Sequence, residues 1–171
     1  MKIDKFLVAL TISIFLIAGI FSFAYEYYAG LNPGFNLYGL VPAAFLGWAT
    51  YDALGGGSKG VIQGILSNMS GVVWSIVIIL IWDYGFDYSL LGAFVSVAVG
   101  AGAMVFQAHY KLLQFVPGTF IGASAFFALG ANINGTTLWP TVLGLLMGIF
   151  LGLISDIFAK YLNTKASSKK A

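Results

Sequence analysis

Apolar residues run along this chain in six blocks, which short polar or glycine-rich segments separate. The blocks lie near residues 6–27, 37–55, 60–81, 88–107, 113–131 and 137–160. A helix needs roughly 20 residues to cross a hydrocarbon core of about 30 Å, and each block is close to that length. The pattern predicts an all-α polytopic membrane protein with six transmembrane helices.

The first block follows a short basic start, so it could also be the apolar part of a signal peptide. Its apolar run is longer than roughly 7–15 residues, the usual length in signal peptides, and Ser22-Phe23-Ala24 is a weak cleavage site. We therefore expect a retained helix.

The sequence contains an internal repeat of sixteen residues. Residues 40–55 read LVPAAFLGWATYDALG, and residues 115–130 read FVPGTFIGASAFFALG, with seven identities in sixteen positions. Each copy is the middle block of a group of three, near residues 6–81 and 88–160. Three is an odd number, so the second group enters the membrane from the opposite side, and the two copies are antiparallel. This predicts a single integral domain over residues 1–171, built as two inverted three-helix repeats around a pseudo-two-fold axis.

The composition agrees with a membrane setting, because 60% of the residues are hydrophobic and only 8% are charged. Soluble domains carry about 25% charged residues. The chain has no cysteine, which excludes disulfides and thiol chemistry.

The positive charges predict the orientation. With the N-terminus in the cytoplasm, all eight lysines fall on the cytoplasmic side, and the last four of them lie at or in the basic tail. Glu26, Asp83 and Asp87 fall on the other side. The positive-inside rule therefore predicts a multi-pass protein with both termini cytoplasmic. The tail, residues 161–171, is expected to contact anionic lipids of the bilayer.

Small residues recur four positions apart in several blocks, which is typical of close helix packing in lipid. They are expected to pack within one bundle. The alternative is an interface between copies of a homo-oligomer, for which the best candidates are Gly144, Gly148 and Gly152.

Asn68 is the clearest polar residue at membrane depth, near the middle of the third block. Polar groups there are costly and mark functional sites. Its amide could line a path for a small polar solute, or it could form a hydrogen bond between helices.

Asp52 is the only acid in the repeated helix, and Phe127 replaces it in the second copy. Its side chain could reach the inner interface and pair with Lys59, or it could be a proton or cation site. Asp156 has Lys160 four residues later, the favourable order for an ion pair on a helix.

The two repeated helices hold other candidates for the lining of a path. Hydroxyl groups and an indole could line it, and two symmetry-related phenyl rings could form paired constrictions, although packing in the core is the alternative for the aromatic residues. These candidates are Trp48, Thr50, Thr119, Ser124, Phe45 and Phe120.

Several chemistries find no support in the sequence. It contains no phosphate-binding glycine loop, no paired histidines for a metal and no nucleophile elbow. Its lysines form no nucleic-acid-binding patch. We expect no enzyme, catalytic residue, cofactor or nucleic-acid partner.

Three segments, residues 42–51, 66–74 and 115–122, resemble the YcdZ-like family of small bacterial inner-membrane proteins, whose function is unknown. The resemblance covers residues 6–160, roughly the whole chain. It implies a multi-span protein of the bacterial cytoplasmic membrane and transfers no substrate or site residue.

The repeat, the scarcity of deep charges and the lack of an energy-coupling domain favour a channel or facilitator for a small polar solute. One alternative is a secondary carrier coupled to protons through Asp52. Another is a membrane scaffold or accessory subunit that transports nothing.

Overall fold

The computed structural model describes residues 4–32 and 37–168, with side chains up to residue 165, and within them the chain is helical. Lys2, Lys169, Lys170 and the predicted turn at Pro33-Gly34 lie outside the described residues. The main helices are α1 (Lys5–Leu31), α2 (Leu40–Ala53), α3 (Gly57–Leu80), α4 (Leu90–Phe106), α5 (Val116–Ala128) and α6 (Leu138–Ser168). A π-helical turn, η1 (Ile81–Gly85), extends α3, and a 3₁₀ turn, η2 (Gln107–His109), extends α4.

Each predicted block overlaps one of these six main helices, and four of the helices are long and apolar enough to cross a bilayer. These four are Lys5–Leu31, Gly57–Gly85, Leu90–His109 and Leu138–Lys165. The repeated helices α2 and α5 have only 14 and 13 residues, which corresponds to roughly 20 Å each. α2 is bounded by Gly39 before it and Gly55 after it, with φ of 86° and 83°, and Gly130 follows α5 with φ of 96°. This left-handed conformation does not continue an α-helix, so the helices are shorter than predicted.

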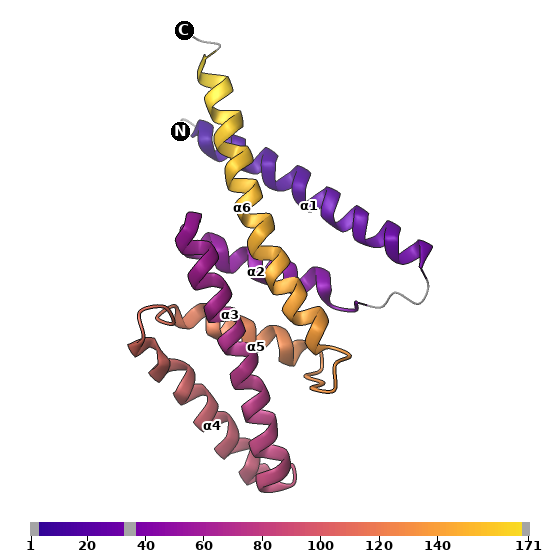
Figure 1. The fold of residues 1–171 in the computed structure, drawn as a ribbon, viewed down its shortest axis with the longest axis vertical. Helices are drawn as coiled ribbons and strands as arrows, with labels where there is room; N and C mark the ends of the chain where they lie inside the picture. Colours follow the sequence, from indigo (N-terminus) through magenta and orange to yellow (C-terminus); the bar gives the residue numbers. More distant parts are fainter. Residues whose placement is uncertain (1–3, 33–36, 169–171) are drawn as a thin grey trace.

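The two short helices lie in the middle of the molecule and each crosses one long helix (Figure 1). α2 packs on α6, and α5 packs on α3. α1 packs along the outside of α6, and α4 packs on α3. A small core between the central helices holds Ala43, Val72, Ala125, Phe126 and Leu145.

Glycine permits both crossings of a short helix over a long one. A Cβ atom on Gly148 of α6 would meet the carbonyl oxygen of Ala44 in α2. A Cβ atom on Gly71 of α3 would likewise meet the carbonyl oxygen of Thr119 in α5. Backbones approach this closely in membrane proteins when small residues form the interface.

The stripe Gly144, Gly148 and Gly152 therefore contacts α2 of the same chain along its whole length. The alternative of an oligomer interface at this stripe is corrected to packing within the chain. The physical reason is that α2 already occupies the hollow that the three glycines leave.

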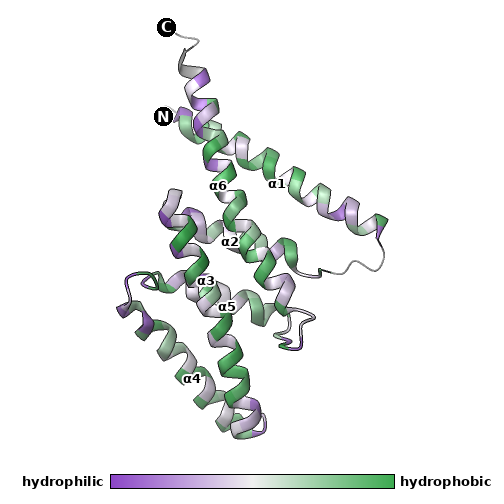
Figure 2. Cartoon of the chain, viewed as in Figure 1, coloured by the Kyte–Doolittle hydropathy of each residue, from purple (hydrophilic) through white to green (hydrophobic). Residues whose placement is uncertain are grey.

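Large apolar side chains cover the outside of the molecule, and α1 and α4 expose most of theirs. Figure 2 shows hydrophobic residues along the lengths of the helices, with many hydrophilic ones at their ends and in the connections. In α1, only Ala9 and Ser13 are buried, against α6. Such a surface is stable in contact with lipid rather than with water.

Candidate functional site

A fully buried pair of polar side chains lies where α2 meets α3. Thr50 Oγ1 is 3.0 Å from Asn68 Oδ1 and 3.0 Å from the carbonyl oxygen of Leu46. One hydroxyl proton cannot serve both acceptors fully. The Asn68 amide nitrogen has no hydrogen-bond partner among the described residues. If the amide is turned over, its nitrogen donates to Thr50 and its oxygen is left over instead. In either orientation one buried amide atom is unpaired.

A second polar cluster joins α3, α5 and the η2 turn. The Gln107 amide nitrogen donates to Ser70 Oγ at 3.0 Å and to Thr119 Oγ1 at 2.9 Å. Its amide oxygen accepts a hydrogen bond from the Trp74 indole N–H at 3.0 Å. Thr119 was predicted from the repeat, whereas Gln107, Ser70 and Trp74 were missed. The signal for Gln107 was an uncharged amide at the end of a strongly apolar helix.

The other predicted path residues divide into a buried and an exposed group. Trp48 of α2 is buried against α6, and its indole nitrogen has no hydrogen-bond partner among the described residues. Ser124 is exposed. Phe45 and Phe120 are 45% and 40% exposed, so they lie on the outer surface of the bundle. The prediction of paired internal constrictions is wrong for these two rings, because the glycine-bearing sides of α2 and α5 take the contacts with α6 and α3.

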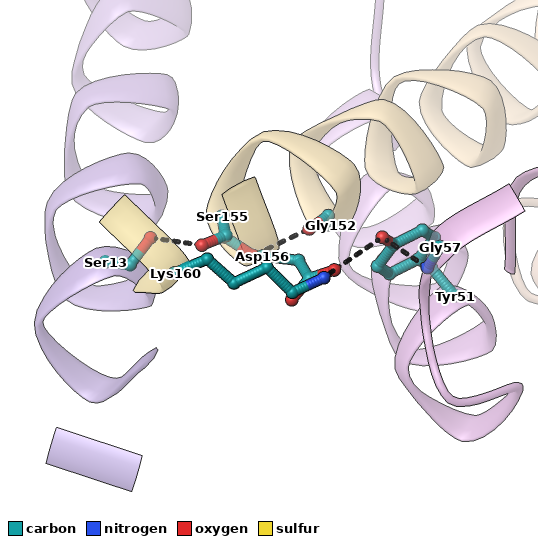
Figure 3. Close-up of polar contacts among 7 residues, drawn as sticks. All are labelled: Ser13, Tyr51, Gly57, Gly152, Ser155, Asp156 and Lys160. Atoms are coloured by element: carbon teal, nitrogen blue, oxygen red, sulfur yellow. Dashed lines mark hydrogen bonds and ion pairs between the residues drawn. The ribbon is translucent and has the colours of Figure 1, made fainter. Parts of the chain in front are cut away.

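Polar groups gather at the C-terminal end of α2, as Figure 3 shows. The Tyr51 hydroxyl accepts a hydrogen bond from the Gly57 N–H at 2.8 Å and lies 3.4 Å from Asp156 Oδ2. Asp156 pairs with Lys160 at 2.8 Å, which confirms the predicted ion pair. Nearby, Ser13 Oγ donates to the carbonyl oxygen of Ser155 at 2.7 Å and joins α1 to α6.

Asp52 lies on the exposed side of α2, beside these groups. It borders a pocket of about 270 Å³ together with Tyr51, Gly56 and Asp156. It also borders a smaller apolar pocket of about 200 Å³ with Phe45 and Trp48. Within the described residues no ion pair joins Asp52 to Lys59, so the predicted pairing is absent there.

A corresponding pocket lies at the C-terminal end of α5, beside Gly130 and Ala131, which align with Gly55 and Gly56 in the repeat. A pocket therefore lies at the C-terminal end of each short helix. The two buried polar clusters lie between α2 and α3 and between α3, α5 and η2. Across residues 4–32 and 37–168, no three His, Cys, Asp or Glu side chains come together as metal ligands.

Comparison with known proteins places the chain in a family. Residues 9–160 match the family described as "Protein of unknown function (DUF1097)". The chain is 32% identical over 148 residues to the "Uncharacterized protein YahC" of Escherichia coli K12, which is 84% of either chain. It is 41% identical over 112 residues to the "Inner membrane protein YcdZ" of the same strain, and this alignment spans 64% of each chain. The YcdZ protein of Salmonella typhimurium is 38% identical over 112 residues, which cover 64% of this chain and 66% of the relative.

No solved structure matches the chain. The predicted resemblance to the YcdZ-like family is confirmed, and the apolar helices agree with the inner-membrane location that the relatives' names state. The chain therefore belongs to the DUF1097 family of unknown function and is an integral protein of the inner membrane.

Proposed function

We propose that this protein is a facilitator that lets small uncharged polar solutes cross the inner membrane. The observation that carries the proposal is the pair Thr50 and Asn68, which is fully buried and leaves one amide atom without a partner. An unpaired polar atom at membrane depth is costly, and it is retained where a polar ligand or water can use it.

The proposed architecture is two inverted repeats of three helices. Gly47 of α2 contacts the backbone of Leu145 in α6, and the aligned Gly122 of α5 contacts the backbone of Asn68 in α3. The two crossings thus use aligned residues in the short helices. With both termini in the cytoplasm, α2 and α5 run antiparallel as short spans. Each short helix and the connecting segments at its ends together cross the bilayer.

The class of solute follows from the buried side chains. The groups in the two buried polar clusters are hydroxyls, amides and one indole N–H, namely Thr50, Asn68, Ser70, Thr119, Gln107 and Trp74. They can exchange hydrogen bonds with a neutral solute, but they offer no charge to replace the hydration of an ion. The close glycine packing leaves room for small solutes only.

The test is solute flux into proteoliposomes, followed by light scattering with urea and glycerol as first probes. Wild type should raise the flux above that of empty liposomes without a gradient of any second solute. Asn68→Leu should reduce that flux by about tenfold, since it removes the polar contact that we place in the path. The fold should tolerate leucine, because Leu145 holds the equivalent place on α6.

Thr50→Val, which replaces the hydroxyl group by a methyl group of similar size, should also reduce the flux. Ser124→Ala is the matched control, because Ser124 is exposed on the outside of α5, and its flux should equal that of wild type. Flux at the empty-liposome level across a broad panel of neutral solutes would contradict the proposal and support a scaffold.

A proton-coupled carrier is the second candidate, and the placement of Asp52 favours it. This carboxylate borders two adjoining pockets at the end of α2 and has no counterpart in α5. The carrier predicts that Asp52→Asn abolishes acidification-driven uptake in proteoliposomes, while binding of the solute remains. Unchanged coupling in Asp52→Asn would exclude this role.

A further inference from the structure

A polar pocket of about 310 Å³ lies where α3 ends and α6 begins. Pockets for small ligands hold roughly 300–1,000 Å³, so this one suits a ligand of a few heavy atoms. Its polar lining consists of Asp83, Tyr84, Tyr88, Asn132 and Asn134. The first three come from the α3–α4 connection and the last two from the α5–α6 connection. None of them belongs to the two buried polar clusters described above.

The backbone around this pocket is strained. In the described part of the chain, the non-glycine residues with positive φ are Asp87 at 48°, Tyr88 at 55° and Ala131 at 50°. Tyr88 and Ala131 line the pocket, and Asp87 directly precedes Tyr88. Asp83 and Tyr84 lie in the π-helical turn η1. Left-handed non-glycine residues and π-helical turns are uncommon, and both gather at functional sites.

Hydrogen bonds and a ring contact hold three of the lining residues in place, namely Tyr88, Asn132 and Asn134. The Tyr88 ring meets the Trp82 ring edge-on with centroids 5.3 Å apart, and the Trp82 indole N–H donates to the carbonyl oxygen of Ser89 at 2.9 Å. On the other side, the Asn134 backbone N–H donates to Asn132 Oδ1 at 2.9 Å. These three residues are therefore positioned before any ligand arrives, which lowers the entropic cost of binding.

The charge of the lining selects the ligand. Asp83 is its one charged residue, so an anion would be repelled. Tyr84 and Tyr88 are 84% and 54% exposed, which leaves their rings accessible to a ligand. Aromatic rings beside a carboxylate attract organic cations. A Ca²⁺ ion, in contrast, takes about six to eight oxygen ligands, often from several carboxylates.

We propose that this pocket binds a small organic ammonium ion. Its N–H groups donate to the Asp83 carboxylate and to the side-chain oxygens of Asn132 and Asn134, and its alkyl carbons lie against Tyr84 and Tyr88. This site does not depend on the proposed passage of neutral solutes, because binding here needs no path through the bundle.

The test is calorimetric titration of the full chain in lipid nanodiscs with ethanolamine, which is a cation at neutral pH. Wild type should bind ethanolamine and not ethylene glycol, an uncharged molecule of similar size. Asp83→Asn should weaken binding about tenfold or more, since it removes a charge-assisted hydrogen bond. Tyr84→Leu should weaken binding by a smaller factor, and this side chain is too exposed to be needed for folding.

Asp87→Asn is the matched control, because it removes the same charge from the same connection without lining the pocket. Its affinity should stay within about threefold of wild type at physiological salt, where charges outside the contact are screened. Equal losses in Asp83→Asn and Asp87→Asn would overturn the site in favour of a diffuse acidic surface. Absence of ethanolamine binding at roughly 10 mM would also overturn it. Neither outcome would affect the flux experiment, which uses neutral probes and other residues.

Discussion

Gly148→Ala is expected to lower the free energy of unfolding by about 2–3 kcal/mol, the upper part of the usual range for overpacking. The added methyl group would meet the carbonyl oxygen of Ala44 and the backbone nitrogen of Trp48. Backbone atoms of a packed helix cannot rotate away from the added methyl group, as the end of a flexible side chain could. α2 would have to move off α6, and the buried contacts between these two helices would loosen together.

Gly102→Ala is the control for this change, since it makes the same substitution in α4 at a position with open space around it. Its effect should stay within about 1 kcal/mol, the difference between glycine and alanine in a helix. Unfolding in mixed micelles with increasing denaturing detergent, followed by circular dichroism, compares the two variants. Equal stability of Gly148→Ala and Gly102→Ala would contradict the close crossing of α2 and α6.

Gln107→Leu is expected to destabilise the protein by about 2 kcal/mol, because three hydrogen bonds between helices are lost and each contributes roughly 0.6 kcal/mol in a membrane protein. These bonds join η2 to Trp74 and Ser70 on α3 and to Thr119 on α5. The substitution also leaves the Trp74 indole N–H without its acceptor. α4 would then be held to the bundle mainly by its packing on α3.

The same micelle titration measures this effect, with Gln114→Leu as the control because Gln114 is exposed in the following loop. A double-mutant cycle with Trp74→Phe isolates one of the three bonds. The two changes should be less than additive, since each removes the same hydrogen bond. Strict additivity would contradict the contact between Gln107 and Trp74.

Much of the architecture could be predicted from the pattern of apolar residues. Each of the six blocks overlaps one main helix, and the helices in the four longest blocks are long enough to cross a bilayer. The lengths of α2 and α5 were overestimated because the apolar blocks extend beyond the ends of the two helices. Gly39 precedes α2, Gly55 follows it and Gly130 follows α5, and the left-handed backbone at each glycine, which hydropathy does not register, limits the helix.

Polar contacts between residues close in the sequence could be predicted, whereas contacts between residues far apart in the sequence could not. The pair Asp156 and Lys160 follows from helical spacing, since residues four apart are neighbours on any helix. The bond between Gln107 and Thr119 joins two helices whose relative placement no local pattern specifies. Asn68 was identified as a buried polar residue, but its partner Thr50 depends on how α2 lies against α3.

By itself, the sequence determined the membrane setting, the number of main helices and the two copies of the short helix, because each depends on local composition or on internal similarity. Only the tertiary structure decided which face of each helix is covered. The stripe Gly144, Gly148 and Gly152 is covered by α2, whereas Phe45 and Phe120 are left on the outside. In lipid, apolar faces are stable whether they are buried or exposed, so hydrophobicity cannot choose between them. The choice follows from shape, since the backbones approach closely where glycines lie at the crossing, as Gly47 and Gly148 do between α2 and α6.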